Sequence, residues 1–125
     1  MEFPEELYYT ADHEWINLEG DTAVVGITAF AAGELGDIVF IDIPKVGEKI
    51  EAGEIFGTVE AVKTVSDLIL PVGGSILEVN PKVIAWPALV NNDPYGDGWL
   101  VKISMDGPAK PGTLLNDEQY RELLG

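Results

Sequence analysis

Short apolar runs that are interrupted by glycine and proline dominate the chain, and this pattern predicts β structure. In the segment Asp37 to Ile43 the two alternating sets of side chains are both largely apolar, which predicts a central strand that ends at Pro44. The other predicted strands are shorter and are bounded by turn residues: Glu14 to Leu18, Thr22 to Ile27, Ile55 to Val59, Asp67 to Leu70, Ser75 to Val79 and Trp99 to Ile103. Many short strands in succession predict a mainly β fold, which we expect to be a flattened antiparallel β barrel or sandwich.

Two segments carry helical patterns instead. Between the second and third predicted strands, the alanine-rich stretch TAFAAGELG predicts a short internal helix that is closed by Gly36. At the carboxyl end, Asn116 is a good helix cap and Gln119 stands where its side chain can reach back to that cap. This pattern predicts a C-terminal helix over about 116–124.

Composition and charge narrow the possible functions. The 22 acidic residues against 7 basic ones give a formal net charge of −15 with histidine neutral, so nucleic acid and anionic membranes are poor partners. The absence of cysteine excludes disulfides and thiolate chemistry of the chain's own, and a single histidine excludes a multi-histidine metal site. The acidic amino terminus and the lack of a long apolar run lead us to expect a monomer made and kept in a bacterial cytoplasm.

One lysine lies in an unusual setting within the segment EAVKTVSDLILP, residues 60–71. Predicted strands flank the stretch from Glu60 to Ser66, which must therefore reverse the chain, with Lys63 at its middle. A lysine in a turn usually serves only solubility. Here, however, Val62 and Val65 stand beside it, and β-branched residues stiffen the chain at a tip where apolar side chains have no obvious use. The pattern favours a rigidly presented amine that a modifying enzyme can recognise and acylate.

Several blocks of the sequence resemble the H protein of the glycine cleavage system, and they occur in that family's order from about Leu7 to Ile103. The blocks are His13-Glu14-Trp15, Gly26-Ile27-Thr28, Leu35-Gly36-Asp37-Ile38-Val39-Phe40, Glu60-Ala61-Val62-Lys63, Ser66-Asp67, Pro87-Ala88-Leu89-Val90-Asn91 and Asp93-Pro94-Tyr95-Gly96-Asp97-Gly98-Trp99-Leu100. The resemblance implies a single lipoyl-carrier domain over residues 1–125, of the barrel-sandwich hybrid type. It also implies lipoate bound covalently to Lys63, and a carrier component in place of an enzyme.

The resemblance further implies a set of partners. Proteins of this family receive an aminomethyl group and electrons from the P protein, which is glycine decarboxylase. They pass the aminomethyl group to the T protein, an aminomethyltransferase, and the L protein, dihydrolipoyl dehydrogenase, reoxidises the arm. A lipoate-attaching enzyme modifies the lysine. The imported dithiol would explain how a chain without cysteine takes part in redox transport.

In this family the loaded arm lies in a surface cleft, and Glu14 and Asp67 match the carboxylates that hold its amine. Charge-assisted hydrogen bonds from a protonated amine to these carboxylates suit that task. The alternative for each residue is a solvated acid at the end of a strand. We expect His13 to be structural and to fix the strand beside Trp15, and we expect Trp86 to be buried over the sandwich.

Some positions depart from the family's pattern and leave other functions open. Ala61 stands where serine is common, Thr64 where alanine is usual, and Ala29 and Phe30 where aspartate with tyrosine or histidine is common. Because of these changes, an H-like protein that relays lipoyl groups to other acceptors remains an alternative to the shuttle. A biotin carrier is disfavoured because methionine commonly flanks a biotinylated lysine, whereas Val62 and Thr64 flank Lys63. The remaining alternative is an unmodified β domain that acts only as a binding module.

Overall fold

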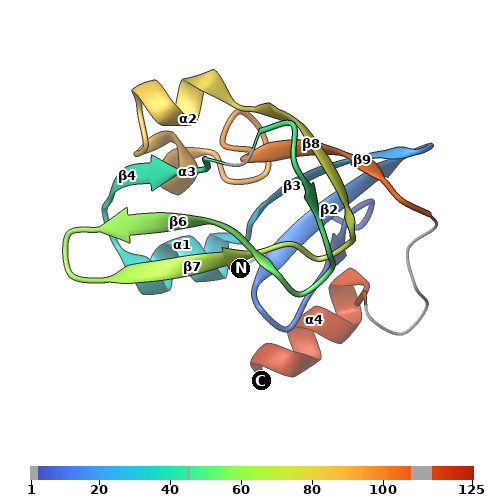
Figure 1. The fold of residues 1–125 in the computed structure, drawn as a ribbon. Helices are drawn as coiled ribbons and strands as arrows, with labels where there is room; N and C mark the ends of the chain where they lie inside the picture. The colour runs from blue at the N-terminus through green and yellow to red at the C-terminus, as the bar shows by residue number, and fades with distance from the viewer. Residues whose placement is uncertain (1–2, 45, 108–113) are drawn as a thin grey trace.

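A computed structural model describes residues 3–44, 46–107 and 114–125 and arranges them in two antiparallel sheets with helices at their edges (Figure 1). Within these residues the larger sheet has six strands, in the order β1 (Tyr8–Tyr9), β2 (Glu14–Glu19), β3 (Thr22–Ile27), β9 (Val101–Met105), β8 (Gly74–Val79) and β5 (Lys49–Ile50). The smaller sheet has three, in the order β4 (Ile38–Asp42), β6 (Ile55–Ala61) and β7 (Val65–Ile69). The helices are α1 (Ala29–Leu35), α2 (Pro81–Ala85), α3 (Leu89–Asn92) and α4 (Asp117–Leu124). The predicted mainly β fold is confirmed, in its sandwich form and not as a closed barrel.

The main core joins the two sheets. Ile16, Val25 and Ile103 of the larger sheet belong to the same buried cluster as Ile41 and Phe56 of the smaller one, and each is at most 2% exposed. Burying a side chain of this size stabilises the fold by about 1.5–3 kcal/mol. The alternation of buried and exposed residues along the strands therefore fixes which face of each sheet turns inward.

A second buried cluster attaches the C-terminal helix. It consists of aromatic and apolar side chains from the amino-terminal segment, β1, β2 and α4: Phe3, Leu7, Tyr9, Trp15 and Tyr120. The rings of Tyr9 and Tyr120 stack with their centroids 5.0 Å apart. The expected capping of α4 is confirmed, because Asn116 accepts a hydrogen bond from the amide of Gln119 and the side chain of Gln119 bonds back to the amide of Asn116.

The expected central strand is wrong in its position. β4 lies at the edge of the three-stranded sheet, and Val39 and Phe40 are 52% and 53% exposed. A break in the pairing register between Ile38 and Phe40 interrupts the alternation, so two consecutive apolar side chains face outward. Ile38 and Ile41 alone carry the strand's contact with the core.

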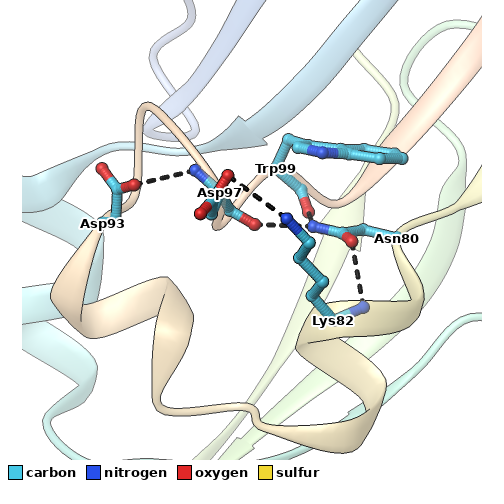
Figure 2. A network of polar contacts seen from close by, with 5 residues as sticks. All are labelled: Asn80, Lys82, Asp93, Asp97 and Trp99. Carbon is cyan, nitrogen blue, oxygen red and sulfur yellow. Dashed lines mark hydrogen bonds and ion pairs between the residues drawn. The ribbon is translucent and has the colours of Figure 1, made fainter.

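Helix α2 was not expected, although its start is marked in the sequence by Asn80 followed by Pro81. Figure 2 shows the polar network that closes the following loop onto this helix. The buried Asn80 side chain accepts a hydrogen bond from the amide of Lys82 and donates to the carbonyl oxygens of Asp97 and Trp99. The Lys82–Asp97 ion pair of 3.6 Å is exposed and adds little to the stability.

The expected burial of Trp86 is also wrong, because its side chain is 54% exposed. Val83 is the buried residue of α2, whereas Trp86 is the residue at which the chain leaves the helix, with φ of −140°. The Trp86 ring therefore does not follow Val83 into the core. None of the helices in the described ranges is long and apolar enough to cross a membrane.

Candidate functional site

The β6–β7 hairpin carries Lys63 at its tip and extends from the body at the left of Figure 1. The last paired residues are Glu60 and Val65, and the amide of Ala61 donates to the carbonyl oxygen of Thr64 at 2.7 Å. The turn is therefore tighter than the stretch from Glu60 to Ser66 that the sequence indicated. Such a short connection leaves the backbone beside Lys63 little freedom.

The hairpin tip rests on the segment that follows α1. The amide of Val62 donates to the carbonyl oxygen of Asp37 at 3.0 Å. Asn91 of α3 holds the residues on both sides of Asp37: its Oδ1 accepts from the amide of Ile38 at 3.0 Å, and its Nδ2 donates to the carbonyl oxygen of Gly36 at 2.8 Å. Asn91 lies in a block that the sequence comparison singled out, but no local signal gave it this role.

The side chain of Lys63 lies over Gly36. A Cβ atom added at Gly36 would meet Lys63 Cε at 3.2 Å, a contact the flexible lysine can relieve, whereas the φ of 79° favours glycine there. Lys49, Lys82 and Lys102 each lie 3.6 or 3.7 Å from a carboxylate oxygen. Lys63 is exposed and has no such ion pair within the described part of the chain. Acylation of its amine would therefore break no ion pair with those residues.

A cleft of about 350 Å³ lies beside the hairpin, and it brings both candidate carboxylates together. Its walls come from the segment before β2, from α1 and from the β6–β7 hairpin. Glu14 of β2 and Asp67 of β7 both line it, the first buried and the second exposed. The pairing of strands distant in the sequence thus creates one site from residues that the sequence shows separately.

Glu14 is the least ordinary group in this cleft. It is 3% exposed, its Oε2 accepts from the amide of Ile69 at 2.9 Å, and its Oε1 is buried without a partner among the described residues. Burial raises the pKa of this carboxyl to about 8, and the nearby charge of Asp12 adds to the rise, while the bond from the Ile69 amide and the nearby hydroxyl of Thr10 oppose it. A buried polar atom without a partner is unusual, and Oε1 could accept a hydrogen bond once the carboxyl is ionised.

Of the positions that depart from the resembled pattern, Phe30 lines the cleft, whereas Ala61 and Thr64 lie in the β6–β7 hairpin. Ala61 is 5% exposed, so a small side chain fills its position without a polar group to satisfy. Phe30 lines the cleft and packs against His13 with the ring centroids 4.9 Å apart. Phe30 therefore adds an apolar ring to the lining of the cleft.

The fold and the hairpin place this chain in the class of antiparallel β sandwiches that carry a lysine on a tight turn. Comparison with known proteins gives the family. A sequence profile described as Glycine cleavage H-protein matches residues 7–125. The chain is 57% identical to the glycine cleavage system H protein of Chlorobium limicola over 127 residues, covering 100% of this chain and 99% of the relative. It is 55% identical to the H protein of Bacteroides fragilis over 124 residues, covering 99% and 98%.

Comparison with solved structures indicates the same family. The crystal structure of a glycine cleavage system H protein from Mycobacterium marinum superimposes with a TM-score of 0.90 at 44% identity, and covers 98% of this chain and 99% of its own. The chain therefore belongs to the glycine cleavage H-protein family.

Proposed function

We propose that this chain is the lipoylated shuttle protein of the glycine cleavage system. On lipoate joined to Lys63 it carries the aminomethyl group from the P protein to the T protein, and it presents the reduced arm to the L protein. The chain itself is a carrier, and its enzymatic partners perform the chemistry. Bound lipoate would supply the sulfur that accepts the aminomethyl group and electrons, because the chain has no cysteine.

The hairpin geometry supports Lys63 as the attachment point. Lys63 is exposed at a tight turn whose tip is anchored through Val62, so an attaching enzyme would meet an accessible side chain on a fixed backbone. Val62 and Val65 are 74% and 59% exposed on either side of it. Exposed apolar side chains beside the lysine offer contact area to the lipoate-attaching enzyme and to the enzymes that use the arm.

The observation that carries the proposal is the unpartnered Oε1 of Glu14 in the adjacent cleft. An ammonium group held there would give Oε1 the donor that it lacks, and ionisation of the carboxyl would turn the contact into a charge-assisted hydrogen bond. Asp67 lines the same cleft and would add a second negative charge near the amine. A lipoyl relay would need the hairpin but has no use for this buried carboxylate, so the cleft favours the shuttle.

Two measurements test the proposal. Intact-mass analysis and peptide mapping of the protein from its own host should find one lipoyl group, on Lys63. An unmodified lysine in cells supplied with lipoate would contradict the assignment.

The second measurement separates the shuttle from the relay. With P protein and glycine, the lipoylated chain should support exchange of carbon dioxide into glycine. A lipoylated chain that is inert in this assay, but restores lipoylation of other acceptor proteins, would identify a relay.

A further inference from the structure

The only histidine of the sequence lies next to Glu14 and has a strained backbone. His13 has φ of 65°, the one positive value outside glycine in the described part of the chain. Its amide donates to the carbonyl oxygen of Thr10, and its own carbonyl oxygen accepts from the amide of Thr28. The strained turn places His13 in the wall of the cleft immediately before Glu14.

The His13 ring is tied to the C-terminal helix by a short chain of polar groups. Nδ1 of His13 lies 2.8 Å from the hydroxyl of Tyr120, and that hydroxyl lies 2.8 Å from Oγ1 of Thr28. Thr28 is the N-cap of α1, and its Oγ1 also accepts from the amide of Ala31 at 3.2 Å. Tyr120 and Thr28 are both 0% exposed, so these hydroxyl groups must find their partners inside the protein.

The number of available protons decides the direction of these bonds. If Tyr120 donated to Thr28, the buried hydroxyl proton of Thr28 would have no acceptor among the described residues, and His13 would need its proton on Nδ1. If Thr28 donates to Tyr120 and Tyr120 donates to His13, every hydroxyl proton has an acceptor. The second arrangement leaves Nδ1 of His13 without a proton and places the proton of the neutral ring on Nε2.

This tautomer matters for the neighbouring carboxylate. With Nδ1 bound to Tyr120, which does not line the cleft, Nε2 is the polar atom that His13 has left for the cleft. Phe30, which packs on the ring, provides no hydrogen-bond acceptor. A protonated Nε2 can donate but cannot take up a proton.

The protonation state of Nε2 affects how long the amine is retained, as the chemistry of loading and loss shows. Loading joins a thiol, formaldehyde and ammonium into an aminomethyl thioether with release of one water, and loss of the amine is the reverse reaction. The carbon–sulfur bond breaks when the nitrogen lone pair assists its departure, so the ammonium must first give up a proton. The carboxylates of the cleft can already accept that proton, and a His13 ring with an unprotonated Nε2 would add a further base beside Glu14 and accelerate the loss.

We propose that Tyr120 is a positioning residue of the amine cleft. Together with Thr28 it holds His13 in the tautomer protonated on Nε2, so that the residue beside Glu14 presents a donor and not a base. The C-terminal helix thereby contributes to retention of the amine from outside the cleft. The part of this inference that concerns the amine rests on the proposed shuttle function, whereas the tautomer does not.

The tautomer can be measured directly, because one histidine gives one set of ring nitrogen resonances. In the full-length protein, at a pH where the ring is neutral, ¹⁵N NMR should show an unprotonated Nδ1 and a protonated Nε2, with a slowly exchanging Tyr120 hydroxyl proton close to the His13 ring. A proton on Nδ1 would overturn the proposal, whatever the state of Lys63. An absence of any group on Lys63 would instead overturn the proposed function and leave this result standing.

The role in retention is tested with Tyr120→Phe and its matched control Tyr9→Phe. Tyr9 is equally buried, stacks on Tyr120 and donates its hydroxyl to the carbonyl oxygen of Pro4 at 2.6 Å, without contact to His13. The lipoylated, reduced proteins are loaded with formaldehyde and ammonium, and the lifetime of the bound amine is followed. Tyr120→Phe should shorten it about fivefold, the effect of one lost hydrogen bond, and Tyr9→Phe should leave it unchanged.

A double-mutant cycle shows whether Tyr120 acts through His13. Asparagine tolerates the left-handed backbone of position 13, so His13→Asn removes the ring with little strain. In that background Tyr120→Phe should no longer change the lifetime. If Tyr120→Phe shortens the lifetime equally in the parent protein and in His13→Asn, Tyr120 acts only through packing and the proposal is overturned. An equal shortening by Tyr9→Phe would have the same meaning.

Discussion

The β6–β7 hairpin and the cleft beside it are built in opposite ways. At the hairpin tip Val62, Lys63 and Thr64 are exposed, and the Val62 amide bonds to the carbonyl oxygen of Asp37 beyond the end of the β4–β6 pairing. In the cleft Glu14 is buried, and the ring of the adjacent His13 is tied to Tyr120 and Thr28. The difference shows that presenting an amine for modification and retaining a bound amine require different surroundings. An amine must be accessible to be modified, whereas a bound cation is best held where water is excluded.

The largest expected effect comes from removing the amine at the hairpin tip. Lys63→Arg keeps the positive charge and much of the stem but provides no amine for amide formation, so lipoylation should be abolished. Lys82→Arg, on an exposed lysine with an ion pair to Asp97, is the control and should be modified as the parent protein is. Intact-mass analysis after incubation with a lipoate-attaching enzyme measures both, and modification of the Lys63→Arg variant would place the arm elsewhere.

The next effect concerns the stability cost of the buried carboxyl. The pKa of Glu14 in the folded protein is about 8 and lies above its ordinary value of 4.5, so the folded chain retains a proton that the unfolded chain loses. The contribution to stability is therefore complete below about pH 4.5 and is lost as the pH rises through 8. Relative to Glu14→Gln, the free energy of unfolding should fall on the order of 5 kcal/mol across that range.

Chemical denaturation at several pH values checks this expectation. Glu19→Gln, at the exposed end of the same strand, is the control and should show no comparable trend. A difference between the parent protein and Glu14→Gln that does not change with pH would mean that Glu14 is ionised in the folded state.

A third effect separates retention of the loaded amine in the cleft from presentation of Lys63 for lipoylation. Glu14→Gln removes the carboxylate that would pair with an ammonium, and the lifetime of the loaded amine should fall about tenfold, in line with one charged hydrogen bond. Lipoylation of Lys63 should proceed normally, because the hairpin is untouched. Equal lifetimes in the variant and the parent would exclude Glu14 from the amine site.

The smallest effect concerns the support of the hairpin tip. Asn91→Ala removes the bonds that hold Gly36 and Ile38 beside Asp37, so hydrogen exchange at the Val62 amide should accelerate about fivefold. Asn92→Ala, at an exposed neighbour on α3, is the matched control. Unchanged exchange at Val62 in Asn91→Ala would show that the tip does not depend on this support.

Features that depend on neighbouring residues could be predicted from the sequence. The capping of α4 by Asn116 and Gln119 is an example, because both partners lie within one helical turn. The tip position of Lys63 was predictable because two strand patterns flank it, although their ends were not sharp enough to show how tight the turn is. The outward position of Phe40 was not predictable, because a register break depends on the partner strand.

The site itself depends on long-range contacts. Ile69, which bonds Glu14, lies 55 residues away along the chain, and Tyr120 lies 107 residues from His13. Sequence resemblance indicated Glu14 as a carboxylate of the cleft. Its unpartnered oxygen and raised pKa follow only from packing, and no local pattern links Tyr120 to the cleft.

The ionisation state of Glu14 before and after loading tests the account most directly. Near neutral pH, below its pKa of about 8, the carboxyl of the unloaded protein should be protonated. When the lipoylated arm carries the amine, the ¹³C resonance of the Glu14 carboxyl carbon should move to the position of a carboxylate, because an ammonium group then occupies Oε1. A carboxyl resonance that stays unchanged on loading would contradict the claim that this buried oxygen receives the amine.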